Sequence, residues 1–566
     1  MPTLLWDPRS KVSLLYGKRT ILKGRRRADS GPAVTAAPVV GPWPSIPAMV
    51  GSTATQFADL VAVRDGSSSL TYAELAESAR EFGAALVAAG VEPGDRVAIW
   101  CGNCAEWTVA ALGAFAAGAV LVPVNTRFKG AEAALVLSRS GARVLVTVTD
   151  FLGTDYVAML EDTGTPLPAL QTIVIAKGNA AGSAQSWPDF TARAAPAARA
   201  EVERRSRGLS PDDPSDILFT SGTTGVPKGV VMTHGRTLIV ASDWVAMTGL
   251  HAGDVYLQVN PYFHMFGLKA GILASIASGA TMLPEPVFDV DRVLARVAAE
   301  HVTVLPGPPT LYQSILDHPQ RAQHDLSSLR VAVTGSADIP VELIRRVDDE
   351  LPFSNVVTGY GLTEAGTACA TSEDDDAEAV ATTVGRPRPG FELRLVGEDG
   401  CAVGTGQSGE VLLRGGSIMA GYLDDPEETA KVLSVDGWLR TGDLGELDEA
   451  GRLRIVGRVK DMFIVGGFNA YPAEIENALL RHPAVQQAAV IGIPDQRLGE
   501  VGMAFVVVSG DVSGQDVIGW SRNEMANYKV PRVVEIVDAL PLNATGKVLK
   551  DVLRERAAAS GASATP

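Results

Sequence analysis

From Leu70 onward, helical stretches alternate with short apolar segments, and this alternation limits the folds that the chain can adopt. A helical pattern over residues 72–89 is followed by apolar runs at 96–100 and 142–148, with Gly, Pro and Asp between the segments. Such alternation is typical of α/β layers in which helices cover buried strands. We therefore predict an α/β fold, with further strands at 216–220, 302–305, 331–333 and 356–358.

The pattern changes after Gly409, where short strands (409–413 and 452–456) separated by turns indicate a β-rich subdomain. From Asp461 onward, two strand–helix units suggest a separable module of about 100 residues. A chain of 566 residues is also too long for a single core. We predict a large domain of layered α/β subdomains plus the β-rich subdomain at 46–459, a small α+β domain at 460–557, and a tail at 558–566.

The first 30 residues carry eight basic side chains and no long apolar stretch, which does not fit a secretory signal. We predict a disordered extension over residues 1–45. A start site placed too early and a basic surface anchor are the alternatives. The longest uncharged run, 107–126, is predicted to form a buried helix ending near Gly118 and a strand at 120–124, rather than a membrane span.

Composition narrows the class of protein. The net charge of −16 argues against coating a nucleic acid, so a polyanionic ligand needs locally placed donors. Cys101 and Cys104 form a lone C-x-x-C without a second pair, which disfavours zinc and favours reduced thiols in a cytoplasmic protein. With 46% hydrophobic residues, the chain can build large cores and is best interpreted as a globular enzyme.

The strongest local signal lies at residues 216–234, where an apolar strand enters a loop of Ser, Thr and Gly with one lysine, Lys228, and then a second β-type run. Hydroxyls, open backbone N–H groups and a cation are what a triphosphate requires. The loop is not a Walker A motif, because Pro227 replaces its second glycine, Gly229 follows Lys228, and no helix opens behind it. A flexible surface turn is the alternative.

Three further segments agree with a nucleotide site. Residues 358–364 place an aromatic ring, a hydroxyl and a carboxylate after an apolar strand. Residues 437–443 place an acid at a turn, where it could accept two sugar hydroxyls. Residues 541–547 leave a lysine on a tight turn. Taken singly, these are also a strand-to-loop junction, an Asx turn and a solvated surface charge.

In this order, the four segments resemble the adenylate-forming superfamily of acyl-CoA synthetases, aryl-CoA ligases, luciferases and peptide-synthetase adenylation domains, over residues 46–557. The resemblance implies ATP, Mg²⁺ and CoA, and a small domain that rotates between two half-reactions. In the first, a carboxylate attacks the α-phosphorus of ATP, pyrophosphate leaves and an acyl-adenylate forms. In the second, the thiol of CoA attacks the adenylate, so no protein nucleophile is needed.

The resemblance also implies roles for individual residues. Those of the phosphate loop are Thr220, Ser221, Gly222, Thr223, Thr224, Gly225 and Lys228. The remaining AMP-binding residues are Gly335, Ser336 and Ala337 with Tyr360 and Gly361 at the adenine, Thr363 at the α-phosphate, and Asp443 with Arg458 at the ribose. Glu364 would hold Mg²⁺, Lys460 would be the hinge, and Gly466, Gly467 and Phe468 would line the CoA tunnel. The catalytic residues would be Lys547, Thr223, Lys228 and His264.

Residues 261–267 match the motif beside the acyl pocket in this superfamily, where His264 would be a gate; a core histidine is the alternative. The motif carries no acid to pair a substrate ammonium, which disfavours an α-amino acid. The expected pocket wall is mostly small or apolar, with Lys269 and Asp338 as its charges, and comprises 267–271, 308–312, 335–338 and 359–367. A fatty acid or an alicyclic, steroid-derived acid is implied, and segments 334–340 and 525–531 resemble ligases of steroid-ring propanoates.

Three alternatives stay open. An acyl-AMP ligase would load a carrier protein, although the compact stretches 367–409 and 422–438 leave little room for the inserted segment of such ligases. A luciferase-like oxygenase would need the same residues, and a non-catalytic nucleotide-binding scaffold belongs to another class of protein. The preferred prediction is a cytoplasmic acid–CoA ligase that uses small molecules, binds no nucleic acid and has no transmembrane segment. Its oligomeric state stays open, a homodimer included.

Overall fold

The predicted α/β alternation is confirmed by the computed structural model of the chain. The structure describes residues 41–220, 227–335, 341–465, 468–495, 497–543 and 547–560, and for residues 468 and 469 the backbone alone. In this part of the chain, no helix has an apolar stretch of the length that a membrane crossing needs. The described chain begins at Gly41, and the buried Ser45 caps helix α1 (Ile46–Gln56).

An eight-stranded sheet forms the first layer. Its strand order is β18 (Gly421–Tyr422), β9 (Lys228–Thr233), β8 (Pro214–Thr220), β4 (Val120–Pro123), β3 (Arg96–Trp100), β5 (Val144–Val148), β6 (Thr172–Lys177), β7 (Gln185–Ser186). From β8 to β7 the neighbours are parallel. Every residue of β4 and β5 is buried, because helices cover both faces of such a sheet.

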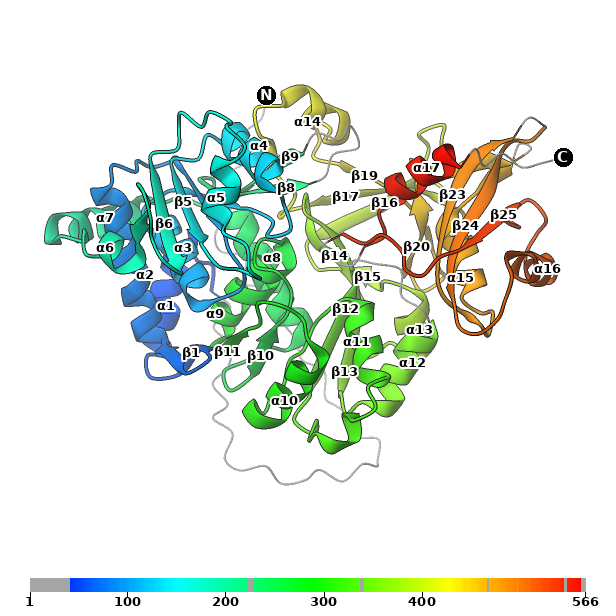
Figure 1. Cartoon of the computed structure of the whole chain (residues 1–566), viewed down its shortest axis with the longest axis horizontal. Coiled ribbons are helices and arrows are strands. Elements are labelled where there is room, and N and C mark those ends of the chain that lie inside the picture. The colour runs from blue at the N-terminus through cyan, green and yellow to red at the C-terminus, as the bar shows by residue number, and fades with distance from the viewer. Residues whose placement is uncertain are drawn as a thin grey trace, which may run out of the picture. The chain divides into compact units, whose positions relative to one another are not determined.

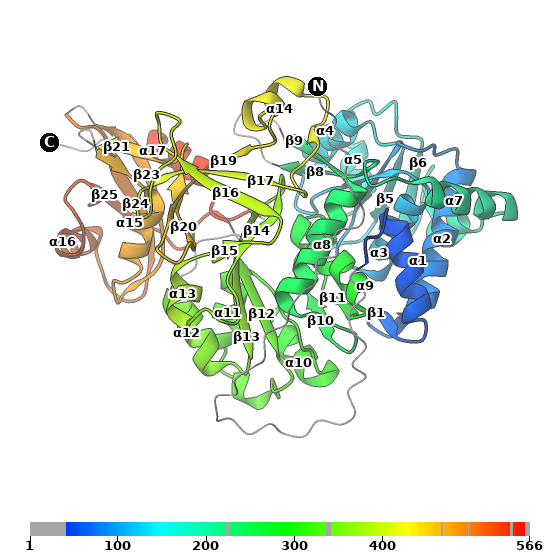
Figure 2. The ribbon, with the colours of Figure 1, turned by 180° about the vertical axis from the view of Figure 1, so that it is seen from behind.

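The helices of this layer connect its parallel strands and cover both faces of the sheet. Helices α2 (Tyr72–Ala88) and α3 (Ala105–Ala116) pack together on one face, and α4 (Gly130–Ser140) and α5 (Tyr156–Glu161) on the other (Figures 1 and 2). Residues 107–116 of α3 are all buried, which confirms the predicted buried helix. Residues 178–200 contain α6 (Trp187–Thr191) and the start of α7 (Pro196–Gly208).

A second sheet has two halves. One half has the order β10 (Val255–Gln258), β11 (Thr281–Pro284), β1 (Val61–Asp65), β2 (Ser68–Thr71), and the other β12 (Val331–Gly335), β13 (Asn355–Leu362), β14 (Gly366–Ala370), β15 (Arg386–Pro387). Val304 joins them through bridges to Tyr256 and Val331, and the predicted strand at 302–305 is reduced to this bridge.

The helices between these strands include one π-helix, η1 (Phe266–Leu273), which continues into α9 (Ala274–Ser278). The others are α8 (His234–Thr248), α10 (Val290–Glu300), α11 (Pro309–Leu316), the short 3₁₀ helix η2 (Arg321–Gln323), α12 (Val341–Glu350) and α13 (Ala377–Thr382).

The β-rich subdomain is confirmed as an antiparallel sheet. Its strands, in order, are β16 (Phe391–Val396), β17 (Gly409–Gly415), β19 (Leu439–Leu447) and β20 (Leu453–Arg458). Helix α14 (Pro426–Val432) lies between β18 and β19 in the chain.

The C-terminal elements, orange to red in Figure 1, form a sheet with its own apolar core, which includes Phe463, Ile475, Phe505 and Leu553. They are β21 (Phe463–Val465), β22 (Phe468–Ala470), α15 (Pro472–Leu479), β23 (Val485–Asp495), β24 (Gly499–Val508), α16 (Gly514–Glu524), β25 (Val533–Ile536) and α17 (Lys550–Ala559). Residues 459–462 connect β20 to β21, and a domain boundary at Lys460 stays a prediction.

Candidate active site

The predicted phosphate loop connects two antiparallel strands. Thr220 ends β8, Lys228 begins β9, and the two residues are register partners. The next helix, α8, starts only after β9, which agrees with the exclusion of a Walker A motif. Residues 221–225 of the loop (Ser221, Gly222, Thr223, Thr224 and Gly225) lie outside the described residues.

Lys228 is paired with an acid that sequence reasoning missed. Its Nζ lies 2.5 Å from Glu428 Oε2 on α14 and 5.2 Å from the centre of the Tyr422 ring. Hydrogen bonds from Lys228 and Lys431 lower the pKa of Glu428 to about 2. Strand β18, which carries Tyr422, pairs with β9 and so brings this group together.

Glu364 lies at the turn between β13 and β14, next to Thr363, and its Oε1 accepts a hydrogen bond of 3.1 Å from the Tyr422 hydroxyl. Burial raises the pKa of Glu364. No group of three or more His, Cys, Asp or Glu residues is placed to hold a metal in the described chain. A single carboxylate fits Mg²⁺, which takes most of its ligands from phosphates and water.

Three predicted nucleotide-binding side chains contact one another, of which Tyr360 and Asp443 are buried and Arg458 is partly exposed. The Tyr360 hydroxyl donates to Asp443 Oδ2 at 2.6 Å, and Arg458 Nε lies 2.9 Å from Asp443 Oδ1. Burial and the Asp443 carboxylate raise the pKa of Tyr360 far above its usual value, so the phenol stays a donor. Tyr360 and Gly361 belong to β13 and Asp443 to β19, which corrects the predicted loop and turn.

Glycines leave one surface beside this triad without side chains. Gly335 ends β12 and pairs with Gly359, and a Cβ at Gly335 would lie 2.9 Å from the carbonyl oxygen of Gly359. A surface of bare backbone suits a flat base. Ser336 and Ala337, predicted to frame the same base, lie outside the described residues.

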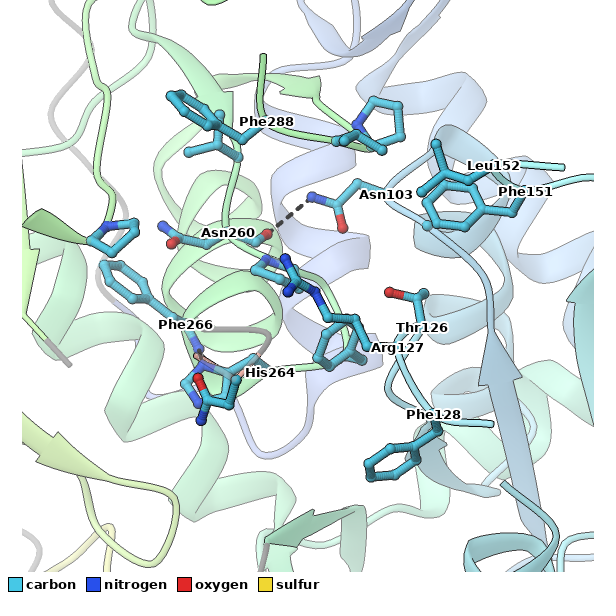
Figure 3. Close-up of a pocket in the computed structure, with 18 of the residues that line it drawn as sticks. Asn103, Thr126, Arg127, Phe128, Phe151, Leu152, Asn260, His264, Phe266 and Phe288 are labelled. Atoms are coloured by element: carbon cyan, nitrogen blue, oxygen red, sulfur yellow. Dashed lines mark hydrogen bonds between the residues drawn. The ribbon is translucent and has the colours of Figure 1, made fainter. Parts of the chain in front are cut away.

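A cavity of about 540 Å³ adjoins Gly335. Its aromatic lining comes from separate loops, with Phe266 and His264 on one side and Phe151 and Leu152 on the other (Figure 3). His264 Nδ1 accepts the N–H of Phe266 at 3.3 Å, so the neutral ring carries its proton on Nε2. Burial lowers the pKa of His264 to about 4. The other phenylalanines of the lining are Phe128, Phe263 and Phe288.

The expected pocket wall is only partly correct. Residues from 308–311 and Gly335 line the cavity, whereas 267–271 and 359–367 do not. Residues 267–271 are buried inside η1, and Lys269 pairs there with Asp216, so its charge does not face the cavity. Asp338 lies outside the described residues.

Several lining residues were missed by sequence reasoning. Arg127 and Lys129 are exposed cations on the loop after β4, at the carboxyl end of a parallel strand, which is where such sheets bind ligands. Asn103, after β3, donates from Nδ2 to the carbonyl oxygens of Gln258 (2.9 Å) and Asn260 (3.0 Å; Figure 3). Its Oδ1 accepts the N–H of Tyr262 at 2.8 Å, so it fixes the segment that leads to His264.

The C-terminal turn reaches the same cavity through Leu542 and Asn543, which line it. Lys547 is exposed, and its N–H donates to Asn543 Oδ1 at 2.8 Å. Lys460 is exposed in the turn after β20. Gly466 and Gly467 lie outside the described residues, and Phe468 is described only as backbone of β22, so the predicted CoA tunnel stays a prediction.

The β8–β9 hairpin with Lys228, the Tyr360–Asp443–Arg458 group and an apolar cavity lie in one α/β fold, which is the arrangement expected of adenylate-forming enzymes. Comparison with known proteins agrees: residues 51–423 match the AMP-binding enzyme family, and residues 474–547 match the AMP-binding enzyme C-terminal domain. The chain belongs to the AMP-binding enzyme family, in its acyl-CoA synthetase branch.

Two similar relatives are the 3-(7a-methyl-1,5-dioxo-octahydro-1H-inden-4-yl)propanoyl:CoA ligases of Rhodococcus jostii and Mycobacterium tuberculosis, each 48% identical over 90% of this chain and 98% of the relative. A feruloyl-CoA synthase of Amycolatopsis is 36% identical over 91% of the chain and 99% of its own length.

Among solved structures, the anthranilate CoA ligase AuaEII with anthranoyl-AMP matches with a TM-score of 0.82 and 28% identity, over 92% of this chain and 99% of that one. The predicted fold class is confirmed, with its large N-terminal and small C-terminal domains. The chain is therefore an AMP-forming acid–thiol ligase that works through an acyl-adenylate.

Proposed function

We propose that the enzyme activates an alicyclic, steroid-derived propanoate and transfers it to CoA. The observation that carries the substrate class is the cavity lining, which is mainly apolar, includes five phenylalanines, and contains no Asp or Glu among the described residues. An ammonium group would enter such a site without a partner and would lose several kcal/mol of hydration. The two relatives that are 48% identical are named for a bicyclic dioxo propanoate, which supports a compact ring acid.

The nucleotide would lie along the strand ends that meet beside the cavity. The phosphate loop with Lys228 would hold the outer phosphates, Thr363 the α-phosphate, and Asp443 with Arg458 the ribose hydroxyls. Glu364 would hold Mg²⁺, which supplies positive charge to the phosphates when it is bound. The bare strand ends at Gly335 and Gly361, beside Tyr360, would receive the adenine.

Adenylation brings two anions together. A carboxylate oxygen attacks the α-phosphorus, the bond from that phosphorus to the bridging oxygen breaks, and pyrophosphate leaves with the electron pair. Lys547 would stabilise the charge that builds up at the α-phosphate, which is the largest kind of contribution in such reactions. His264, neutral at the cavity wall, would act as the gate that admits the acid and not as a base.

Thioester formation needs a second ligand at the cavity. The CoA sulfur attacks the acyl carbon, the bond to AMP breaks and AMP leaves with the electron pair, while the thiol proton passes to solvent. Arg127 and Lys129 stand at the exposed rim of the cavity and would attract the phosphates of CoA. The small domain would turn about Lys460 between the two steps.

A panel of acids with ATP and Mg²⁺, with and without CoA, tests this function. The panel is the methyl-dioxo-octahydroindene propanoate, octanoate, palmitate, a cinnamate and phenylalanine. We expect acid-dependent pyrophosphate release, CoA-dependent thioester, and a kcat/KM for the ring propanoate at least about a hundredfold above that for phenylalanine. Removal of Mg²⁺ with EDTA should stop the release.

The other outcomes separate the alternatives. Pyrophosphate release without a CoA thioester would favour an acyl-AMP ligase that loads a carrier protein, and nucleotide binding without any acid-dependent release would favour a scaffold. A preference for phenylalanine would overturn the substrate class. We also propose a cytoplasmic location, because ATP and CoA are available there.

A further inference from the structure

Asp216 and Lys269 form an ion pair in the core that the proposed chemistry does not use. Lys269 Nζ lies 2.9 Å from Asp216 Oδ1, and both side chains have no exposed surface. Two ions taken out of water lose hydration that their attraction barely repays, so well-packed apolar residues would often be at least as stable. Stability alone therefore does not explain the pair.

The carboxylate of this pair is held from its other side as well. Ser215 Oγ donates to Asp216 Oδ2 at 2.7 Å, and Thr237 Oγ1 donates to the same oxygen at 2.8 Å. Ser215 belongs to β8 and Thr237 to α8, so two elements fix the direction in which Asp216 faces Lys269. The pair is thus oriented and not only buried.

The two residues lie on elements that serve different substrates. Asp216 is on β8, four residues before Thr220, where the phosphate loop begins. Lys269 is on η1, three residues after Phe266, which lines the cavity beside His264. The pair therefore joins the strand that feeds the phosphate loop to the helix that follows the acid gate.

The start of η1 packs directly against the backbone of the cavity wall, so we expect the two to move together. A Cβ on Gly267 would lie 2.1 Å from the Pro261 carbonyl oxygen and 2.8 Å from that of Asn260, and both residues line the cavity. A ligand that displaces this wall must therefore also displace η1 and Lys269. π-Helical turns are frequent at functional sites, where they aim side chains that an α-helix would place elsewhere.

We propose that Asp216 and Lys269 are positioning residues that couple the acid site to the phosphate loop, so that acid and nucleotide bind cooperatively. The inference rests on the proposed function in that the cavity takes the acid. Neither residue touches a substrate; each acts through the element that carries it. Coupling of this kind is commonly worth a 5- to 150-fold change in affinity.

The test separates positioning from packing by comparing Lys269→Met, Asp216→Leu and the double variant. The readouts are the urea midpoint and the affinity for α,β-methylene-ATP with Mg²⁺, measured by calorimetry with and without the methyl-dioxo-octahydroindene propanoate. We expect both single variants to lower the midpoint, because each leaves one buried ion unpaired. The double variant should regain part of the loss, because it removes both ions but leaves the Ser215 and Thr237 hydroxyls without their carboxylate acceptor.

The double variant should nevertheless bind α,β-methylene-ATP at least about tenfold more weakly than the wild type. The acid should raise the nucleotide affinity of the wild type at least about fivefold, and that of the double variant hardly at all. A double variant that regains both the midpoint and the nucleotide affinity would show that the pair only fills the core, and would overturn the inference.

Two further variants keep the test decisive. Asp216→Asn keeps the volume and an acceptor for both hydroxyls while it removes the negative charge, so wild-type nucleotide affinity in it would also overturn the inference. Arg330→Met breaks another ion pair outside the site, in which a half-buried arginine lies 2.5 Å from the buried Asp254. It should lower the midpoint and leave the nucleotide affinity unchanged.

Failure of the proposed function stays distinguishable. If the wild type released no pyrophosphate with any acid of the panel, the proposed function would fail, while the nucleotide titration without acid would still decide whether the pair positions the phosphate loop. If the wild type makes the thioester and the double variant matches it in affinity and midpoint, only the inference fails.

Discussion

Lys547 is the residue on which adenylation should depend most. It lies on a turn closed by hydrogen bonds of 2.8 Å between Lys547 and Asn543, and Asn543 lines the cavity. We predict that Lys547→Ala slows acid-dependent pyrophosphate release at least about a hundredfold, since a lost charge contact in the transition state costs about 3 kcal/mol or more. Thioester formation from supplied acyl-adenylate should persist, and an unchanged release rate would remove Lys547 from the mechanism.

His234 should make stability depend on pH. It is fully buried beside Phe115, and burial lowers its pKa from 6.5 to about 4. Below pH 6.5, His234 becomes protonated in the unfolded chain but stays neutral in the folded chain until the pH approaches 4. The free energy of unfolding therefore decreases as the pH falls, by about 2 kcal/mol at pH 5. Urea unfolding at pH 7 and pH 5 measures this decrease. In His234→Gln, the decrease in the free energy of unfolding should be smaller than in the wild type by about 2 kcal/mol.

The matched control for this prediction is His251→Gln, because His251 is exposed. It should keep the full loss of stability between pH 7 and pH 5. Equal pH dependence in the two variants would mean that His234 does not resist protonation in the folded state.

At the scale of single residues, the sequence predicts which side chains matter better than it predicts their partners. The segment 437–443, with glycines at both of the positions Gly437 and Gly442 before Asp443, predicts a turn. Gly442 does have a φ of +72°, yet Asp443 lies inside a strand. Glu428, 200 positions after Lys228, is within reach only because β18 pairs with β9. A partner set by sheet order leaves no local signal.

At the scale of elements, two glycines of η1 offer a matched comparison. A Cβ at Gly267 would meet the Pro261 carbonyl oxygen at 2.1 Å, whereas at Gly271 the nearest atom would be 3.5 Å away. We predict that Gly267→Ala costs about 2 kcal/mol or more of unfolding free energy and raises KM for the acid, because the cavity wall must move.

Gly271→Ala should change the unfolding free energy by about 1 kcal/mol at most, since alanine fits a helix better than glycine. Denaturant unfolding of both variants measures the change in unfolding free energy, and steady-state kinetics measure the change in KM for the acid. Equal effects of the two substitutions would mean that η1 is not pressed against the wall.

The elements themselves were largely predictable, but the cavity was not. The hairpin of β8 and β9 and the pair of α3 and β4 follow from local patterns of apolar residues and glycine. The cavity instead collects loops after β3, β4 and β5, at the carboxyl ends of neighbouring parallel strands. Which loops lie next to one another depends on strand order, and apolar patterns do not encode strand order. The sequence therefore did not predict Arg127 and Phe151 as cavity-lining residues.

At the scale of the whole molecule, the connection between β20 and β21 should separate the two half-reactions. Lys460 is exposed there, and Val459 before it donates its N–H to the carbonyl oxygen of Gly442 at 2.9 Å. We predict that Lys460→Pro, which fixes φ, leaves pyrophosphate release within about threefold of the wild type and lowers CoA-dependent thioester formation at least about tenfold.

Lys460→Ala is the control for charge and side-chain length, and it should leave both rates near the wild type. Equal damage to both half-reactions by Lys460→Pro would mean that the rotation takes place about another residue. The measurement needs pyrophosphate release and thioester formation to be followed separately in the same preparation.

The pairing of Lys228 with Glu428 has a consequence for turnover. Lys228, the lysine proposed to bind the outer phosphates, has the Glu428 carboxylate beside it. When a triphosphate binds, it would replace the Glu428 carboxylate as the partner of Lys228. When the phosphates leave, the carboxylate would return to Lys228. Once the bond to the α-phosphorus has broken, pyrophosphate competes with a carboxylate that is tethered to the protein and cannot diffuse away. With Lys228 in its proposed role, Glu428 would act as a displacing anion held by the protein itself, and we expect the enzyme to be poorly inhibited by the pyrophosphate it makes.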